Sequence, residues 1–486
     1  MAQPESQSWL DRPILHGIPL TREQGLYFLL ILACLVSRLV MLGYRVQSHD
    51  ESLHCKFSWD LYAGLGFQHN PMMHGPLDFH LVALSYFLFG DSDFTARLPI
   101  AMMGTVLVAF PYFLRRWLGR WGALAASFLL LISPSITYYS RYIRHDIPAA
   151  LWAVLVVWAM FRYLEEGRDR HLYILAAALS LMFATKEVAF IYTAIFGLFL
   201  VGLLVIQATR ERWDRRGAET AFVGALVGLA VGLILLAVGL ARRTNLALRL
   251  GGGLAVLSPL AGAAALLYGI WPRRREYRVL DLIFLIGTLT LPFASPLPIH
   301  GAAWLAAQLV ERSPSLGSVP FWLHLSQLHP TDYTAPAIYY SGVILALTIA
   351  AAVALGLLWD RRRWPVAAAI HTGIFLVFFT TVFTNGAGIA SGWVGSLGYW
   401  LEQHGVQRGG QPWFYYLVIL PLYDFLPLLG FLAATLFLLA RAVRNAIRSA
   451  VRPPQPAPPD SSGRSAIGHS VIGHSVIGHS VIGHSV

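Results

Sequence analysis

Long apolar runs, separated by short clusters of arginine, constrain what this chain can fold into more than any other feature. Apolar residues make up 56% of the 486 residues and charged residues only 13%, which is too hydrophobic for a soluble domain of this size. We therefore predict an all-α, polytopic membrane protein with about 12 transmembrane helices of roughly 20 residues each. The runs lie at 26–44, 98–114, 121–138, 147–163, 171–185, 188–207, 220–240, 246–270, 279–298, 337–358, 365–384 and 413–440.

The arginine clusters predict how these helices are oriented. Cytoplasmic loops of membrane proteins carry an excess of Lys and Arg, and a cytoplasmic N-terminus places every cluster of this chain on the inner side. The formal net charge of +11 therefore reflects topology in a cell membrane, with both termini cytoplasmic, rather than nucleic-acid binding. The inner residues are Arg115, Arg116, Arg120, Arg168, Arg170, Arg210, Arg212, Arg215, Arg216, Arg273, Arg274, Arg275, Arg278, Arg361, Arg362, Arg363 and the 441–452 tail.

This orientation requires that the apolar segment 79–90 does not cross the membrane. Its sequence, FHLVALSYFLFG, has 12 residues, which is too short for a full span. We expect a helix that lies in the outer interface as part of the first outer loop.

Ionisable side chains gather on the three loops that this topology places outside. Asp50 and Glu51 lie in the first loop, Asp146 in the second, and Lys186 beside Glu187 in the third. Such groups are costly in lipid unless they are paired or line a wet cavity. A carboxylate there can deprotonate an acceptor hydroxyl, and Arg or Lys can hold a phosphate leaving group. The alternative is that these loops are merely polar and their acids and arginines pair with one another.

Five motifs in this order resemble the GT-C membrane glycosyltransferases, in the branch of the protein O-mannosyltransferases and aminoarabinose transferases. They are SRLVMLGYRVQSHDE, HGPLDFHLVALSYFLFG, ARLPIAMMGTVLVAFPYFLRRWLG, SRYIRHDIPAALWAV and ATKEVAF. A later stretch, QRGGQPWFYYLVILPLYDFLPLL, resembles the flippase activity-associated subfamily of prokaryotes. The first resemblance covers roughly 26–210 and the second 385–430.

The resemblance implies an inverting transferase. It would move a sugar from a polyprenyl-phosphate donor to a hydroxyl of a protein, lipid or glycan at the outer face of the membrane. Asp50 matches the catalytic carboxylate and Glu51 its neighbour, while Lys186 matches a lysine on the phosphate side. The H-P-P-L segment of the family is His74-Gly75-Pro76-Leu77 here, so Gly75 stands in place of one proline of the pair. The expected substrate-binding residues are His74, Arg141, Arg144, His145, Asp146, Lys186 and Arg408.

Two further site hypotheses come from the residues themselves. His49, Asp50, Glu51 and His54 can supply ligands for a divalent metal, or they can form a hydrogen-bonded, solvent-facing cluster. No cofactor is certain, and the metal is unknown. Arg408 is followed by two glycines, which let the backbone approach a phosphate that the arginine would hold.

The chain is expected to divide into four parts. These are a cytoplasmic segment at 1–25, a catalytic transmembrane module at 26–210, a variable transmembrane module at 211–448, and a disordered tail at 449–486. The tail is rich in proline and ends in four IGHSV repeats. The rival function is a lipid-linked sugar flippase or transporter component without transferase activity. Such a protein would place its ionisable residues near the middle of the bilayer, whereas here they cluster at one face.

Overall fold

The computed structural model describes residues 8–14, 20–210, 213, 215–403, 406, 410–412, 414–423 and 425–451. Arg408 and the IGHSV repeats lie outside these residues. The chain forms two compact units. The expected boundary near residue 210 stays a prediction.

The first unit contains residues 1–40, 104–141 and 408–486. Its longest helices are α1 and α22, and α1 begins with a capping box in which Thr21 and Gln24 exchange hydrogen bonds. The helices are η1 (Trp9–Asp11), α1 (Arg22–Leu39), the end of α4 (Asp93–Ala109), α5 (Pro111–Leu118), α6 (Arg120–Ile132), α7 (Pro134–Tyr139), α21 (Tyr415–Tyr423) and α22 (Phe425–Val451).

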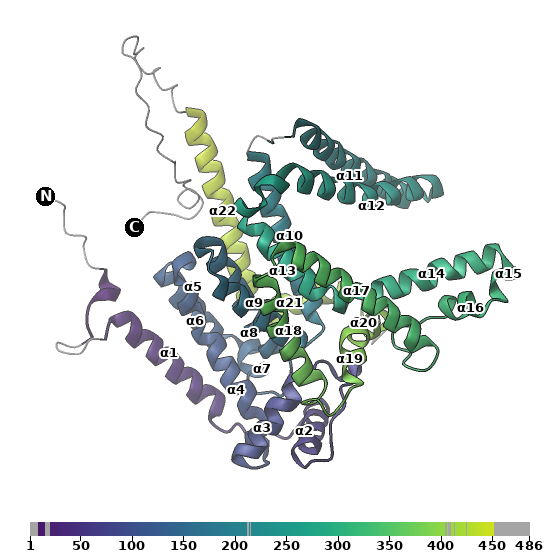
Figure 1. Cartoon of the computed structure of the whole chain (residues 1–486). Helices are drawn as coiled ribbons and strands as arrows, with labels where there is room; N and C mark the ends of the chain where they lie inside the picture. The colour runs from purple at the N-terminus through teal and green to yellow at the C-terminus, as the bar shows by residue number, and fades with distance from the viewer. Residues whose placement is uncertain are drawn as a thin grey trace, which may run out of the picture. The chain divides into compact units, whose positions relative to one another are not determined.

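The second unit contains residues 41–103 and 142–407 and is also helical (Figure 1). Its helices, besides the start of α4, are α2 (His49–Tyr62), η2 (Pro71–Met73), α3 (Leu77–Phe89), α8 (Asp146–Glu166), α9 (Asp169–Phe183), α10 (Val188–Arg210), α11 (Arg216–Arg242), α12 (Asn245–Ile270), η3 (Trp271–Glu276), α13 (Arg278–Thr290), η4 (Pro292–Ala294), α14 (Pro296–Arg312), α15 (Pro314–Gly317), α16 (Pro320–Ser326), α17 (Ala337–Trp359), α18 (Arg363–Phe379), α19 (Gly388–Ala390), the π-helical turn η5 (Ser391–Gly395) and α20 (Ser396–Gln403). Apart from an isolated bridge between Pro13 and Thr21, the described residues contain no β-structure, so the all-α expectation is confirmed for them.

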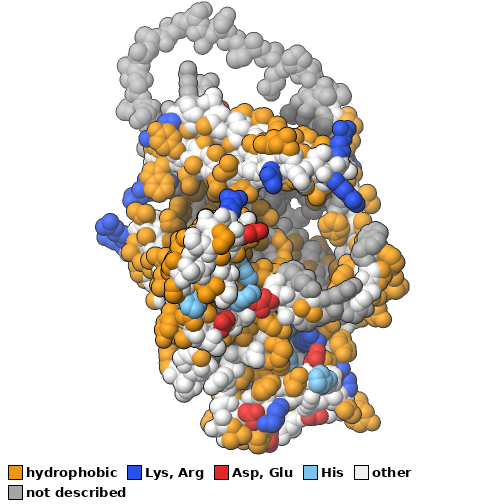
Figure 2. All heavy atoms as spheres, turned by 90° about the vertical axis from the view of Figure 1, so that its right-hand side faces the viewer, with side chains coloured by type: hydrophobic (Ala, Val, Ile, Leu, Met, Phe, Trp, Pro, Cys, Tyr) orange, Lys and Arg blue, Asp and Glu red, His pale blue; other side chains and the backbone are white. Residues whose placement is uncertain are grey.

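Among the described helices, seven are long and apolar enough to cross a membrane, or eight if the bent pair Arg278–Thr290 and Pro292–Arg312 counts as one span. The seven are Asp93–Leu118, Asp146–Glu166, Val188–Arg210, Gly217–Arg242, Asn245–Glu276, Ala337–Trp359 and Phe425–Asn445. Hydrophobic side chains cover much of the face shown in Figure 2, as expected of helices that contact lipid.

This number is smaller than the twelve spans predicted. The runs at 26–44, 121–138, 171–185 and 365–384 form α1, α6, α9 and α18, which have 18, 13, 15 and 17 residues. Three of them are short of a full span, and α1 carries Arg22, Glu23 and Arg38. Length and charge are therefore the physical reasons for the difference.

The segment 79–90 forms α3, an apolar helix of 13 residues. Its length confirms that it is too short to cross a bilayer. Helix α2 precedes it, and the two share a small core in which Cys55 contacts Val82 and Tyr86.

Helices α8 and α9 form a hairpin at the centre of the main core of the second unit. Leu172 and Leu179 of α9 are fully buried there, together with Leu282 of α13 and Phe375 of α18. The turn of the hairpin is at Gly167, whose φ of +66° favours glycine. Arg278 donates to the carbonyl oxygens of Leu164 and Glu165 at 2.9 and 2.7 Å, which satisfies the carboxyl end of α8. The first residue of α8 and the turn after α9 consequently lie together at the opposite end of the hairpin.

Candidate active site

The amino end of α2 presents two neighbouring carboxylates. Ser48 caps the helix: its hydroxyl accepts from the Glu51 N–H, and the Glu51 carboxylate accepts from the Ser48 N–H at 3.1 Å. This capping box begins the helix immediately after the apolar run ends. It also places Asp50 in the first turn, where the helix dipole stabilises negative charge.

Glu51 is fully buried and its carboxylate is saturated. Arg97 of α4 donates to both of its oxygens, from Nε at 2.9 Å and from Nη2 at 3.2 Å, and Arg45 donates at 2.8 Å. The Ile143 N–H adds a fifth contact at 3.3 Å. Burial acts to raise the pKa of Glu51, but the hydrogen bonds from Arg97 and Ser48 outweigh it and the pKa is lowered. Glu51, Arg45 and Arg97, here called the Glu51 cluster, therefore hold three segments together.

Asp50 lies in a different environment. Arg144 Nη1 donates to its Oδ2 at 2.6 Å, and 44% of the Asp50 side chain is exposed. Arg144 also faces Asp146, whose Oδ2 lies 4.0 Å from Nε, and Lys186 Nζ donates to the other oxygen of Asp146 at 2.7 Å. The chain of ion pairs Asp50, Arg144, Asp146 and Lys186, here called the Asp50 cluster, joins all three predicted loops.

The loop before α3 packs directly against the turn that carries Lys186. The Gly75 N–H donates to the Thr185 carbonyl at 3.1 Å, and a Cβ at residue 75 would lie 2.2 Å from the carbonyl oxygen of Ala184. Only glycine fits this approach, which explains why Gly75, and not a proline, precedes Pro76 here. His74, at a φ of +68°, donates from Nδ1 to Glu187 Oε2 at 2.6 Å. Glu187 therefore pairs with His74, while its neighbour Lys186 pairs with Asp146.

Behind the Asp50 cluster lies a buried group of imidazole rings. His54 contacts the Asp50 carbonyl through Nδ1 at 2.7 Å and stacks on Phe79. The ring centroid of His145 lies 5.0 Å from that of His54 and 5.2 Å from that of His74. Burial, followed by the neighbouring positive groups, lowers the pKa of His145 well below its usual value, and burial also lowers that of His54. Both rings are therefore neutral at pH 7.

Asp78, in the first turn of α3, is the least expected residue of this region. Its side chain is fully buried, neither oxygen has a hydrogen-bond partner among the described residues, and Oδ2 lies 3.7 Å from His145 Nδ1. Burial, reinforced by the charge of Asp146 and opposed by Lys186, raises the pKa of Asp78 to about 8. Asp78 and His145 are accordingly a neutral pair near pH 7.

The other predicted site residues have different outcomes. Arg141 belongs to the first unit, where it donates to the carbonyl oxygens of Ser37 and Val40 at 2.6 and 2.9 Å and so binds the carboxyl end of α1. Arg408 is outside the described residues. Within the described part of the chain, no group of three or more His, Cys, Asp or Glu side chains is placed to hold a metal ion. His49, Asp50, Glu51 and His54 do not assemble into one, because Glu51 binds arginines and His54 is turned to a carbonyl.

Sequence reasoning missed Arg97 and Asp78. Both are ionisable residues inside apolar segments, and the cost of such residues in lipid is itself a signal that each needs a partner or a function. For Arg97 the partner is Glu51, 46 residues away in the sequence.

A half-exposed chain of carboxylates and cations beside neutral imidazoles defines a polar site at the ends of apolar helices. It is suited to group transfer involving an anionic lipid.

Comparison with known proteins finds a family match for one segment of the chain. Residues 73–238 match the model of a family described as dolichyl-phosphate-mannose-protein mannosyltransferase. The expected resemblance to membrane mannosyltransferases is therefore confirmed for that segment, which contains Arg144, Asp146 and Lys186 but not Asp50. The likeness of 385–430 to the flippase activity-associated subfamily stays a prediction.

Among solved structures, the chain is similar to the archaeal oligosaccharyltransferase AglB from Archaeoglobus fulgidus, in complex with an inhibitory peptide and a dolichol-phosphate. The identity is 14% and the TM-score 0.34, over 83% of this chain and 54% of the AglB chain. The chain thus spans about half the length of that protein. A search of curated proteins finds no match.

Proposed function

We propose that this protein is an inverting, GT-C type glycosyltransferase that moves a sugar from a polyprenyl-phosphate donor to an acceptor hydroxyl. The family match over 73–238 supports a lipid-phosphate-linked sugar as the donor. The acceptor is a hydroxyl of a protein, a lipid or a glycan. The polytopic helical fold supports a reaction at the membrane surface.

The observation that carries the proposal is the environment of Asp50. Arg144 engages Oδ2, while the Oδ1 oxygen has no partner among the described residues and the side chain is 44% exposed. This oxygen accepts the proton of the acceptor hydroxyl as the acceptor oxygen forms its bond to the anomeric carbon. The bond from that carbon to the phosphate oxygen breaks, and its electron pair leaves with the polyprenyl phosphate. Attack and departure on opposite faces invert the anomeric centre.

Lys186 and Arg144 stabilise the leaving phosphate. Lys186 has three N–H donors, of which one donates to Asp146. Arg144 has five N–H donors. Both side chains can therefore also donate to phosphate oxygens. The buried Glu51 cluster orients the first turn of α2 and does not take part in the chemistry.

The site lies at the outer face in this proposal. The positive-inside arrangement needs the shorter helices α1, α6, α9 and α18 to count as spans beside the seven or eight longer ones, and it needs α3 to stay in the interface. Asp50, Asp146 and Lys186 then share one side of the membrane.

The test is a complementation experiment in cells that lack this protein. The wild type and Asp50→Asn are expressed, and membrane glycans, glycoproteins and polyprenyl-phosphate sugars are measured. The substitution keeps the shape but removes the base, which is worth about 10²–10⁴-fold in rate. We expect the glycosylated product to disappear and the lipid-linked donor to accumulate.

Asp60→Asn is the matched control, because Asp60 is on the same helix and pairs with Lys56. It should behave as the wild type. Wild-type amounts of product with Asp50→Asn would exclude Asp50 as the base and favour a flippase or transporter component.

A further inference from the structure

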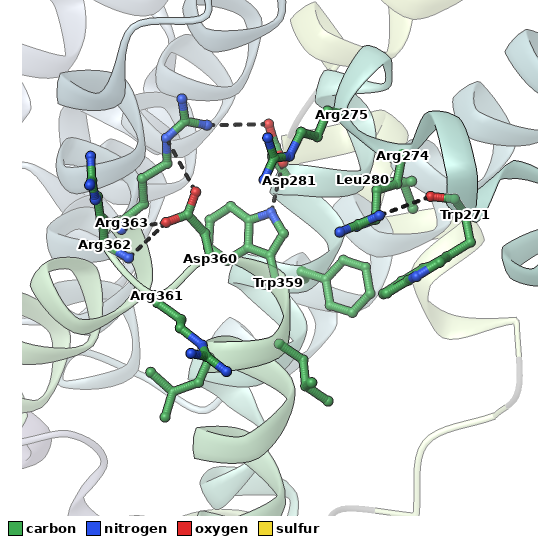
Figure 3. Close-up of a pocket in the computed structure, with 13 residues that line it drawn as sticks. Trp271, Arg274, Arg275, Leu280, Asp281, Trp359, Asp360, Arg361, Arg362 and Arg363 are labelled. Carbon is green, nitrogen blue, oxygen red and sulfur yellow. Dashed lines mark hydrogen bonds and ion pairs between the residues drawn. The ribbon is translucent and has the colours of Figure 1, made fainter.

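A polar pocket lies in the second unit, where η3, the start of α13, the end of α17 and the start of α18 meet (Figure 3). It has a volume of about 570 Å³. Five arginines line it against two aspartates, Asp281 and Asp360, a formal charge of +3. The arginines are Arg274, Arg275, Arg361, Arg362 and Arg363.

The two aspartates are already engaged and neutralise only one of the arginines. Asp281 accepts from Trp359 Nε1 at 2.7 Å and from the Tyr163 hydroxyl. Asp360 accepts from the backbone N–H groups of residues 362 and 363. Arg363 faces both, at 3.7 Å each, and Asp169 at 3.0 Å. The nearby carboxylates therefore compensate the charge of Arg363 alone.

The remaining cations are available to a ligand. The guanidinium groups of Arg275, Arg361 and Arg362 have no hydrogen bond or ion pair to any described residue, and Figure 3 shows no dashed line from these side chains to another residue. Arg274 donates to the Trp271 carbonyl at 3.2 Å and its guanidinium lies 4.7 Å from the Trp271 ring. Uncompensated guanidinium groups in one concavity are a strong site for phosphate, which they bind in a bidentate manner.

The position of the pocket points to a lipid as the source of that phosphate. Helix α17 is a candidate span whose apolar window is only 17% buried within the protein, so most of that surface is free to contact lipid. Leu358, beside the arginines, is 65% exposed, and Trp271 is 38% exposed, as expected for an interfacial tryptophan. The pocket thus combines phosphate-binding groups with a surface for acyl chains.

The pocket is remote from the candidate active site. Arg363 binds Asp169 at the turn end of the α8–α9 hairpin, whereas Asp146 and Lys186 are at the other end. The 21 residues of α8, at about 1.5 Å per residue, separate the two by roughly 30 Å, the thickness of a bilayer core. This separation matches the distance between the two surfaces of a membrane.

We propose that this arginine pocket binds the phosphate headgroup of an anionic phospholipid in the leaflet opposite the candidate active site. Arg361, Arg362 and Arg275 hold the phosphate, and the acyl chains lie along α17. In other membrane proteins, basic pockets between transmembrane helices bind such headgroups. The proposal does not depend on what the protein transfers.

The test uses the full chain in a zwitterionic detergent. Binding of short-chain phosphatidylglycerol is measured by native mass spectrometry, with phosphatidylcholine of the same chain length as the reference. We expect selective binding of phosphatidylglycerol, weakened about tenfold or more in the Arg361→Gln/Arg362→Gln variant, the change expected for one lost charge-assisted hydrogen bond.

The control variant Arg210→Gln/Arg444→Gln removes the same charge from exposed positions outside the pocket, and it should bind as the wild type does. Thermal unfolding verifies that both variants fold. Unchanged affinity in the pocket variant, or an equal loss in the control, would overturn the site. A third arm adds inorganic phosphate: if millimolar phosphate displaces the lipid completely, the pocket is a site for free phosphate and the lipid assignment is wrong.

Discussion

The Glu51 cluster and the Asp50 cluster begin on consecutive residues of one helix and have opposite surroundings. Glu51 has no exposed surface and accepts from two arginines and two backbone N–H groups. Asp50 is nearly half exposed and binds one arginine. A carboxylate whose every acceptor site is used can only hold structure, whereas one with an open oxygen can exchange a proton. The difference shows that burial, rather than residue type, separates scaffold from chemistry at this site.

The largest expected difference between the two clusters is the loss of stability when each carboxylate is replaced. Glu51→Gln leaves Arg97 buried without a counter-charge, and breaking a buried pair costs about 3–5 kcal/mol. Asp50→Asn removes a half-exposed pair, which is worth about 0–1 kcal/mol. Both cysteines, Cys34 and Cys55, are buried, so a thiol-reactive fluorophore reports unfolding on heating. Equal unfolding temperatures for the two variants would remove the distinction between the clusters.

The next effect concerns donor binding within the Asp50 cluster. Lys186→Gln removes a charged contact to the leaving phosphate, worth roughly 1.5–3 kcal/mol, so affinity for a polyprenyl-phosphate sugar should fall by about one to two powers of ten. The affinity is measured by equilibrium binding in detergent. The sequence has one other lysine, Lys56, which is exposed and pairs with Asp60, and Lys56→Gln is the matched control. If both variants bind as the wild type does, Lys186 is not a phosphate ligand.

The most gradual effect, spread over several pH units, is on the pH dependence of stability. The pKa of Asp78 is about 8 in the folded protein against about 3.9 in an unfolded chain. Between these values the folded state holds a proton that the unfolded state has released. Stability therefore falls as pH rises from about 4 to about 8, by at most about 1.4 kcal/mol per pH unit.

Asp78→Asn should flatten this slope and should not destabilise the protein at pH 8. Thermal unfolding is recorded at several pH values for the wild type, Asp78→Asn and Asp60→Asn. The last variant should keep the slope of the wild type. A slope that Asp78→Asn leaves unchanged would mean that water or another group compensates the buried carboxyl.

Much of the site was predictable because apolar runs end where loops begin. The end of the first apolar run predicted that Asp50 lies in a loop at the membrane surface. The positive-inside pattern, with 79–90 too short to cross, predicted that Asp146 and Lys186 lie on the same side of the membrane as Asp50. The motifs in order then indicated the family, and a match over 73–238 agrees with it. The number of spans was less predictable, because a hydrophobic run such as 121–138 can end early as a helix of 13 residues.

The sequence alone determined the class of the protein, since a chain that is 56% apolar must satisfy its backbone hydrogen bonds in helices that cross a membrane. It also determined which residue types gather at the loop ends. Only the tertiary structure decided their partners. Arg144 joins Asp50 to Asp146, Arg97 pairs with Glu51, and His74 pairs with Glu187. The reason is geometric. Ion pairs form over about 3 Å between residues that are 40 to 113 positions apart, and only the packing of the helices brings such residues together.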